Sequence, residues 1–175
     1  VRDITQIKQV VDLPVIGIIK KDYPGTPMYI TVTMQEVDEL VACGVDILAV
    51  QGTGALRPNG QTSAEFIRAI KEKVDLPLVL HGGSGNPDSE IAEAVKIGIQ
   101  KVNISSDYKS AFFLKAREIL SQEGSGWDPN NLFPECIEAG KAVIKQKMEL
   151  FGCVGAAVPP TAIEDIICVT KAYSS

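Results

Sequence analysis

The sequence contains only one histidine, His81, among its 175 residues. A zinc site built from three histidines of a single copy of this chain is therefore excluded. The four cysteines (Cys43, Cys136, Cys153 and Cys168) show no CxxC spacing. We expect reduced, mostly buried thiols, as in a cytoplasmic protein.

Long apolar runs and basic clusters are also missing. No uninterrupted apolar stretch approaches the length of a membrane span, and the first residues show no signal-peptide pattern. The net charge of -5, without any basic run, argues against nucleic-acid binding. The chain starts at Val1 rather than at methionine, which leads us to expect a piece of a longer reading frame.

What the sequence does contain is a regular alternation of apolar strands and amphipathic helices. Capping boxes at Thr33 to Glu36 and Thr62 to Glu65 mark two helix starts, and the stretch 124–134 is expected to be irregular. Strands are predicted at 15–19, 45–50, 76–80 and 101–104; helices are predicted at 3–10, 34–43, 62–73, 87–97, 107–120 and 136–151, with a further short helix at 162–170.

This alternation predicts an α/β fold with about four parallel strands and extra C-terminal helices. Four strands make a partial, half (β/α)8 TIM-type barrel, because a complete barrel takes roughly 250 residues. A half barrel has two open sheet edges, so we expect either pairing with a second copy into a homo-oligomer or an open sheet.

A glycine turn follows the third predicted strand, at Gly82, Gly83, Ser84 and Gly85, and opens a helix. Polar residues also follow the next strand, in the segment Asn103, Ile104, Ser105 and Ser106. Backbone N–H groups at a helix start suit an anion, most often phosphate. The sequence therefore predicts a sugar-phosphate site, with a purely structural turn as the alternative.

Three further side chains have two interpretations each. Lys20, at the end of the first predicted strand, is either a base with a lowered pKa or a solvated lysine. Arg57 either clamps a phosphate or covers a helix face, and His81 either binds a metal or is a hydrogen-bonded strand-end histidine. Aromatic and methionine side chains are assigned to the core: Phe112, Phe113, Met148 and Phe151.

Two stretches of sequence resemble two different families. Residues 1–73, with VVDLPVIGIIKKDYPGTPMYIT and RPNGQTSAEFIRAIKEK, resemble N-acetylmannosamine-6-phosphate 2-epimerases. Residues 74–157, with LPLVLHGGSGNPDSEIAEAVKIG and KVNISSDYKSAFFLKAREIL, resemble the C-terminal part of class II fructose or tagatose bisphosphate aldolases. We expect one α/β domain with a junction near residue 73 and a tail at 158–175.

The epimerase resemblance implies a role for Lys20 as the general acid/base that moves the proton beside the acetamido group. The glutamate that would be its partner has no counterpart, and Gln51 replaces the acidic residue of the family's next strand end. The aldolase resemblance implies zinc as cofactor, His81 as one of its three ligands, and phosphate binding by Gly82, Gly83, Ser84 and the segment 103–106. The stretches that would supply the catalytic aspartate and the other two histidines are absent.

Three functional hypotheses follow. The first is a sugar-phosphate-binding barrel fragment of the class II aldolase type, which would cleave a ketose bisphosphate to glycerone phosphate and an aldehyde. The second is an N-acylmannosamine-6-phosphate 2-epimerase, an isomerase that needs no metal. The third is an inactive fusion, natural or designed, that only binds phosphate. The catalytic set is incomplete for both enzymes.

Overall fold

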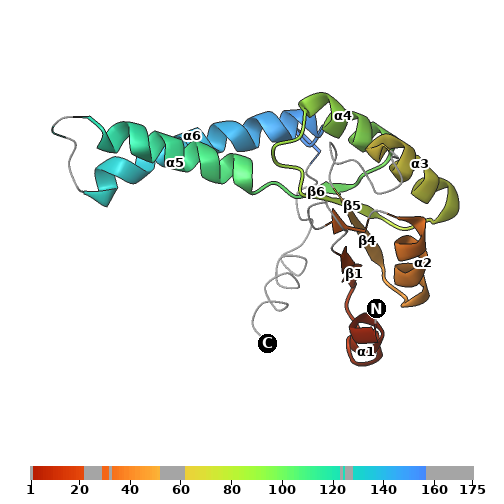
Figure 1. Cartoon of the computed structure of the whole chain (residues 1–175). Coiled ribbons are helices and arrows are strands. Elements are labelled where there is room, and N and C mark those ends of the chain that lie inside the picture. The colour runs from red at the N-terminus through yellow and green to blue at the C-terminus, as the bar shows by residue number, and fades with distance from the viewer. Residues whose placement is uncertain are drawn as a thin grey trace.

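The computed structural model describes residues 2–21, 29–31, 33–51, 62–122, 124 and 128–156. A sheet covered by helices forms the body, and a pair of long helices projects from it (Figure 1). In chain order the elements are α1 (Arg2–Val10), β1 (Ile16–Gly17), β2 (Lys20–Lys21), β3 (Tyr29–Ile30), α2 (Met34–Ala42), β4 (Ile47–Gln51), α3 (Ser63–Lys73), β5 (Leu78–His81), α4 (Asp88–Ile97), β6 (Lys101–Val102), α5 (Ser106–Leu120) and α6 (Pro129–Leu150).

The main sheet has four parallel strands in the order β1-β4-β5-β6. Each step along the sheet is also a step along the chain, with α2, α3 and α4 as the crossovers. This is the arrangement of consecutive βα units in a barrel. The prediction of an α/β fold with half of a TIM-type barrel is confirmed.

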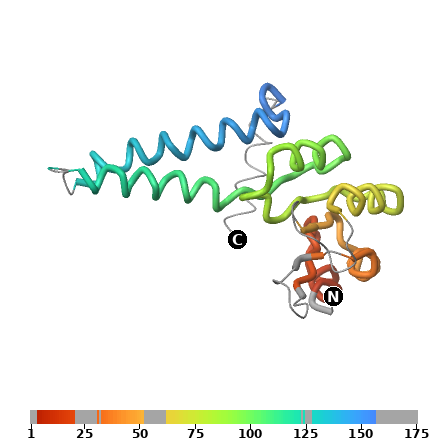
Figure 2. The backbone as a smooth tube through the Cα atoms, turned by 45° about the horizontal axis from the view of Figure 1, so that its top comes forward, coloured from red at the N-terminus to blue at the C-terminus, as the bar shows by residue number. Residues whose placement is uncertain are grey.

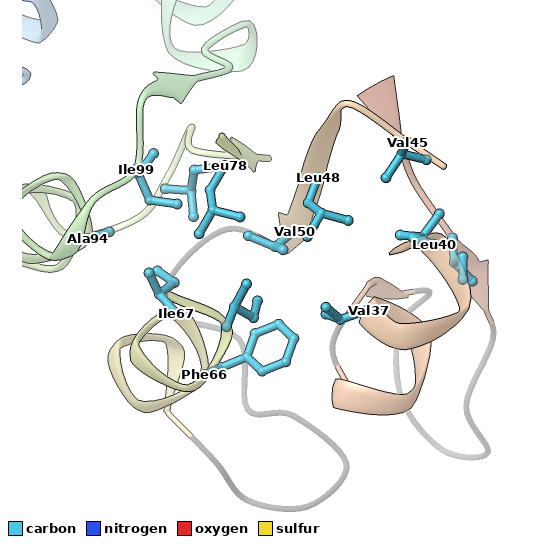
Figure 3. Packing of buried hydrophobic residues seen from close by; sticks show 13 residues of the cluster. Val37, Leu40, Val45, Leu48, Val50, Phe66, Ile67, Leu78, Ala94 and Ile99 are labelled. Carbon is cyan, nitrogen blue, oxygen red and sulfur yellow. The ribbon is translucent and has the colours of Figure 1, made fainter. Parts of the chain in front are cut away.

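The core lies between the strands and the crossover helices. Leu48 and Val50 on β4 and Leu78 on β5 point toward the helix layer, where Phe66 of α3 meets them (Figure 3). Leu80, two residues after Leu78 on β5, belongs to the same buried cluster. The buried cluster comprises Ile19, Val37, Leu40, Val45, Leu48, Val50, Phe66, Ile67, Ile70, Leu78, Leu80, Ala94 and Ile99. The intervening positions of β4 and β5, which end in Gln51 and His81, therefore face the other side of the sheet.

Both predicted capping boxes are present. The Glu36 N–H donates to Thr33 Oγ1 at 3.3 Å, and the Thr33 N–H donates to Glu36 Oε2 at 3.1 Å. The same pair of bonds joins Thr62 and Glu65, at 3.3 and 2.8 Å. Each box satisfies amide groups that the first helical turn leaves without partners.

The helical hairpin α5–α6 corrects two predictions. α6 starts at Pro129, whereas the sequence predicted a start at Cys136. Asp128 caps the helix by accepting a 2.9 Å hydrogen bond from the Asn130 N–H, and proline suits the first helical position. Half of the stretch expected to be irregular is thus helical. Phe113 and Met148 are 67% and 43% exposed, so their assignment to the core was wrong.

Other predictions have mixed outcomes. Cys43 and Cys136 are buried as expected, whereas Cys153 is exposed. Cys168 and the helix predicted at 162–170 lie outside the described residues. Within the part of the chain that the structure describes, no helix is both long and apolar enough to cross a membrane.

Candidate functional site

The carboxyl ends of the parallel strands meet at one edge of the sheet. Gln51 ends β4 and His81 ends β5, and the two are partners in the strand register. Asn103 follows β6, and its N–H donates to the Leu80 carbonyl at 3.0 Å. In folds of this kind the site lies at this edge.

The tips after β5 and β6 are in direct contact. The Gly83 N–H donates to the Asn103 carbonyl at 3.1 Å. A Cβ atom on Gly83 would lie 2.7 Å from Val102 Cγ1 and 3.2 Å from the Asn103 oxygen. The sequence requires glycine here because the second tip approaches the backbone closely.

Ser84 connects the glycine turn to the start of α5. Its Oγ accepts hydrogen bonds from the N–H groups of Ser105, at 3.0 Å, and Asp107, at 3.4 Å. The predicted phosphate ligands of the two tips are therefore neighbours, but part of their hydrogen-bonding capacity is already used within the protein. The Asn103 side chain is likewise engaged, since its Oδ1 accepts from Lys101 Nζ.

A carboxylate accepts a hydrogen bond from one backbone amide of the glycine turn. Asp107 Oδ1 accepts a 3.0 Å hydrogen bond from the Gly85 N–H. Its other oxygen lies 3.6 Å from Nζ of Lys147, a side chain that is only 12% exposed. Lys147 also contacts Asp88, at the start of α4, at 2.7 Å. This lysine thus joins α6 to the starts of both α4 and α5.

The charge state of Lys147 follows from these contacts. Burial by itself lowers the pKa of Lys147. The hydrogen bond to Asp88 and the negative charges of Asp88 and Asp107 outweigh burial, so that the pKa lies above its ordinary value. Lys147 is therefore a firmly held cation beside the glycine turn.

Sequence reasoning missed Asp107 and Lys147. An aspartate in the first helical turn directly after the polar tip was a usable signal, because acidic residues favour that position. Lys147 had no comparable local signal, since 40 residues separate it from Asp107 and only the return of α6 brings it near.

Lys20 does not end the first strand of the main sheet as predicted. The chain leaves that sheet after Gly17, and Lys20 begins the antiparallel β2–β3 ribbon, where its side chain is exposed. Thr31 fixes this ribbon: its N–H donates to the Ile19 carbonyl at 2.8 Å and its Oγ1 accepts from the Ile19 N–H at 3.1 Å. The carbonyl of Thr31 also accepts from the Gln51 N–H at 3.5 Å.

Thr31 is a third residue that the sequence did not reveal. It is buried, and its φ of 46° is the one left-handed backbone angle of a non-glycine residue in the described ranges. Such an angle is unfavourable for a β-branched residue and persists where surrounding structure imposes it, often next to sites. Thr31 holds the Lys20 ribbon against the ends of β1 and β4.

The described residues do not fit the zinc site that the aldolase resemblance implies. His81 is half-buried at the end of β5. Among the described residues, no group of three or more histidine, cysteine, aspartate or glutamate side chains lies close enough together to hold a metal. His81 is the one histidine of the sequence that could serve as a zinc ligand. Arg57, the predicted phosphate clamp, lies outside the described residues.

Comparison with known proteins connects this geometry to two families. Residues 13–156 match the family described as fructose-bisphosphate aldolase class-II. Over 101 residues, the chain is 44% identical to a protein of Caldanaerobacter subterraneus subsp. tengcongensis named "Putative N-acetylmannosamine-6-phosphate 2-epimerase". That stretch covers 58% of this chain and 42% of the relative.

Solved structures give the same two resemblances. The YdjI aldolase from Escherichia coli K12 aligns with a TM-score of 0.58 and 31% identity, over 73% of this chain and 47% of that one. The N-acetylmannosamine-6-phosphate 2-epimerase from Clostridium perfringens aligns with a TM-score of 0.52 and 25% identity, over 86% of this chain and 76% of that one.

The chain thus spans less than half the length of the curated epimerase relative and of the solved aldolase. Both predicted resemblances are confirmed, while the division at residue 73 stays a prediction. The match to the family covers residues 13–156, well over half of the sequence, and the structure has four consecutive βα units of its barrel. The chain therefore belongs to the class II fructose-bisphosphate aldolase family of sugar-phosphate enzymes.

Proposed function

We propose that the strand tips after β5 and β6 bind the phosphate group of a sugar phosphate. The observation that carries the proposal is the 3.0 Å bond from the Gly85 N–H to Asp107 Oδ1. A carboxylate oxygen there does what a phosphate oxygen would do, which supports an anion-binding role for the turn. Family membership supports a sugar phosphate as the ligand.

Further donors surround the same position. In the described part of the chain, the N–H groups of Gly82, Ser84 and Ser106 donate to no other described group. Lys147 adds a positive charge 3.6 Å from the Asp107 carboxylate. A phosphate entering the turn would displace Asp107 from Gly85 and gain more donors than a carboxylate can use.

Thermal unfolding with and without inorganic phosphate tests this binding. Phosphate at ten times its dissociation constant should raise the unfolding free energy by about 1.4 kcal/mol. Asp107→Asn should tighten phosphate binding about fivefold, because it removes about 1 kcal/mol of charge repulsion. Ser84→Ala should weaken it, since the two tips lose their shared acceptor.

Glu118→Gln is the matched control for Asp107→Asn, because it removes a carboxylate from the far end of the same helix. It should leave the phosphate affinity unchanged. The proposal fails if phosphate gives no stabilisation of the parent protein. It also fails if Asp107→Asn and Glu118→Gln change the affinity equally.

For the reaction, we propose aldol chemistry of the class II type in a cytoplasmic setting. Zinc could act only with ligands beyond those that the described residues supply, from a longer protein or a second chain. The measurement is release of glycerone phosphate from a ketose bisphosphate with zinc added, together with the zinc content of the purified protein. Release that depends on His81 would support the proposal, and its absence would contradict it.

The epimerase activity is a second candidate because of the 44% identity to a protein bearing that name. Lys20 would then move the proton beside the acetamido group. Uptake of solvent deuterium into N-acetylmannosamine 6-phosphate, lost in Lys20→Ala, would support it. If both reactions are absent while phosphate still binds, the third hypothesis of an inactive phosphate-binding protein is the one that stands.

A further inference from the structure

A groove lies at the base of the helical hairpin, where the end of α6 comes back beside the start of α5 (Figures 1 and 2). Its volume is about 460 Å³, and two of its apolar side chains, Ile144 and Met148, are 46% and 43% exposed. Contact of such a surface with water is unfavourable, so the groove suits an apolar occupant. The apolar and aromatic residues that line it are Val102, Ile104, Tyr108, Ile144, Met148 and Phe151.

Two lysines add positive charge to the groove. Lys147 already contacts Asp88 and Asp107, at 2.7 and 3.6 Å. Lys109 is exposed, and it forms no ion pair with another described residue. An occupant that carries carboxylates beside its apolar face would therefore find an opposite charge in Lys109.

The chain itself contains a segment with this pattern. A short helix is predicted at 162–170, outside the described residues. Three isoleucines would fall within about 100° of one another around the axis of that helix and form one apolar stripe: Ile163, Ile166 and Ile167. Two consecutive acidic residues, Glu164 and Asp165, stand among them in the sequence. The segment thus combines an apolar stripe with negative charge.

This segment starts close enough to reach the groove. The Cys153 N–H donates to the Met148 carbonyl at 2.9 Å, so the chain turns back at the end of α6, beside the groove. Six residues separate Ala156 from Ile163, and they span up to about 20 Å when extended. The groove follows α6 over residues 144–151, a rise of only about 10 Å. The isoleucine stripe can therefore be placed along its whole length.

We infer that the segment 163–170 docks as a helix in this groove, within the same copy of the chain. Its isoleucine stripe would cover Ile144 and Met148, and its carboxylates would face Lys109. Eight helical residues are about 12 Å long, which matches the length of the groove. The groove wall includes Ser105, so the docked segment would also lie against the tip after β6. The inference does not depend on phosphate binding.

Oxidation of Met148 in the full chain tests the docking. Hydrogen peroxide converts exposed methionine to its sulfoxide, and mass spectrometry gives the rate at each methionine. In the parent protein Met148 should be protected. Ile163→Glu places a charge in the stripe and should raise the oxidation rate of Met148 several-fold. Met34, which packs against the core, serves as the internal reference and should keep its rate.

A charge reversal tests the role of Lys109. Lys109→Glu should also raise the oxidation rate of Met148, because it would face the acidic residues of the segment. Adding Glu164→Lys and Asp165→Lys to that variant should restore the protection. Such a restoration identifies a direct interaction between the two sites. Failure to restore it contradicts the inference.

Cys168→Glu is the matched control for Ile163→Glu. It adds the same charge to the same segment, but Cys168 lies at least about 100° from each of the three isoleucines around the predicted helix. It should leave the oxidation of Met148 at the parent rate. In every variant the helical circular dichroism should match that of the parent and the buried Cys136 should stay unreactive toward thiol reagents, which separates undocking from unfolding.

Three results overturn the inference. The first is an equal rate of Met148 oxidation in the parent and in Ile163→Glu. The second is an equal effect of Ile163→Glu and Cys168→Glu. The third is protection of Met148 that disappears when the parent protein is diluted, because a second copy would then cover the groove.

Discussion

The closest backbone contact of the candidate site gives the sharpest test of its construction. In Gly83→Ala, the new methyl group would lie 2.7 Å from Val102 Cγ1, 3.2 Å from the Asn103 carbonyl oxygen and 3.2 Å from Ile104 Cδ1. Two of these three neighbours, Asn103 and Ile104, belong to the tip that follows β6. The methyl group can be accommodated only if the two tips move apart.

The cost has two parts. Inserting a methyl group into a packed contact destabilises a protein by about 1–3 kcal/mol. Moving the tips apart also weakens the 3.1 Å bond from the Gly83 N–H to Asn103, a loss of about 1 kcal/mol. The unfolding free energy should therefore fall by about 2–4 kcal/mol, and phosphate should stabilise the variant less than the parent.

Urea unfolding followed by circular dichroism measures the first effect, and the phosphate-induced rise in melting temperature measures the second. Gly82→Ala is the matched control, because a Cβ there meets no atom within 4 Å and only its φ of +70° is unfavourable. That strain costs about 1–2 kcal/mol. If Gly83→Ala is no more destabilising than Gly82→Ala, the two tips are not packed as described.

Three further variants test the supports of the fold. Thr62→Ala removes the acceptor of the Glu65 N–H and should lower the unfolding free energy by about 1 kcal/mol, measured by urea unfolding. The hydrogen bond from Lys8 and that from the Val15 N–H hold the pKa of Asp46 below its ordinary value of 3.8. Its contribution to stability is therefore present above pH 3.8 and lost as the pH falls through the folded-state pKa; melting curves across this range should show that loss in the parent and not in Asp46→Asn. Lys147→Met leaves two carboxylates without their cation and should cost about 1–2 kcal/mol in urea unfolding, whereas no loss would mean that the base of the hairpin is held by packing alone.

The layout of the sheet could be predicted from the sequence because it depends on local patterns. Buried parallel strands are continuous apolar runs, and the capping boxes at Thr33 and Thr62 mark helix starts through residues only three positions apart. The strands themselves are shorter than predicted: β1 covers only Ile16–Gly17 and β6 only Lys101–Val102. A run of apolar residues shows which residues are buried. Buried residues continue beyond those that pair with a neighbouring strand, so the runs are longer than the strands.

The site could be predicted only in part. The order of the parallel strands predicts that the tips after β5 and β6 lie side by side, and the glycine turn shows where along the chain the first tip begins. The sequence could not show that Asp107 occupies the turn, because an aspartate that caps a helix and one that competes with a ligand have the same local pattern. Nor could it show that Lys20 leaves the main sheet, since Thr31, which causes this through its bonds to Ile19, lies 12 residues from Ile19.

The contacts of Asp107 determine how strongly the turn can bind a ligand. In the structure Asp107 satisfies the Gly85 N–H and faces Lys147 at the same time. An incoming phosphate would take the hydrogen bond from the Gly85 N–H, but Asp107 would keep Lys147 as a neighbouring cation. Lys147 Nζ lies 3.6 Å from the Asp107 carboxylate and 2.7 Å from that of Asp88. Displacement therefore costs one hydrogen bond and added charge repulsion, and it does not leave Asp107 without an opposite charge. Because α6 supplies that cation, removing Lys147 should weaken phosphate binding even if the turn itself is unchanged.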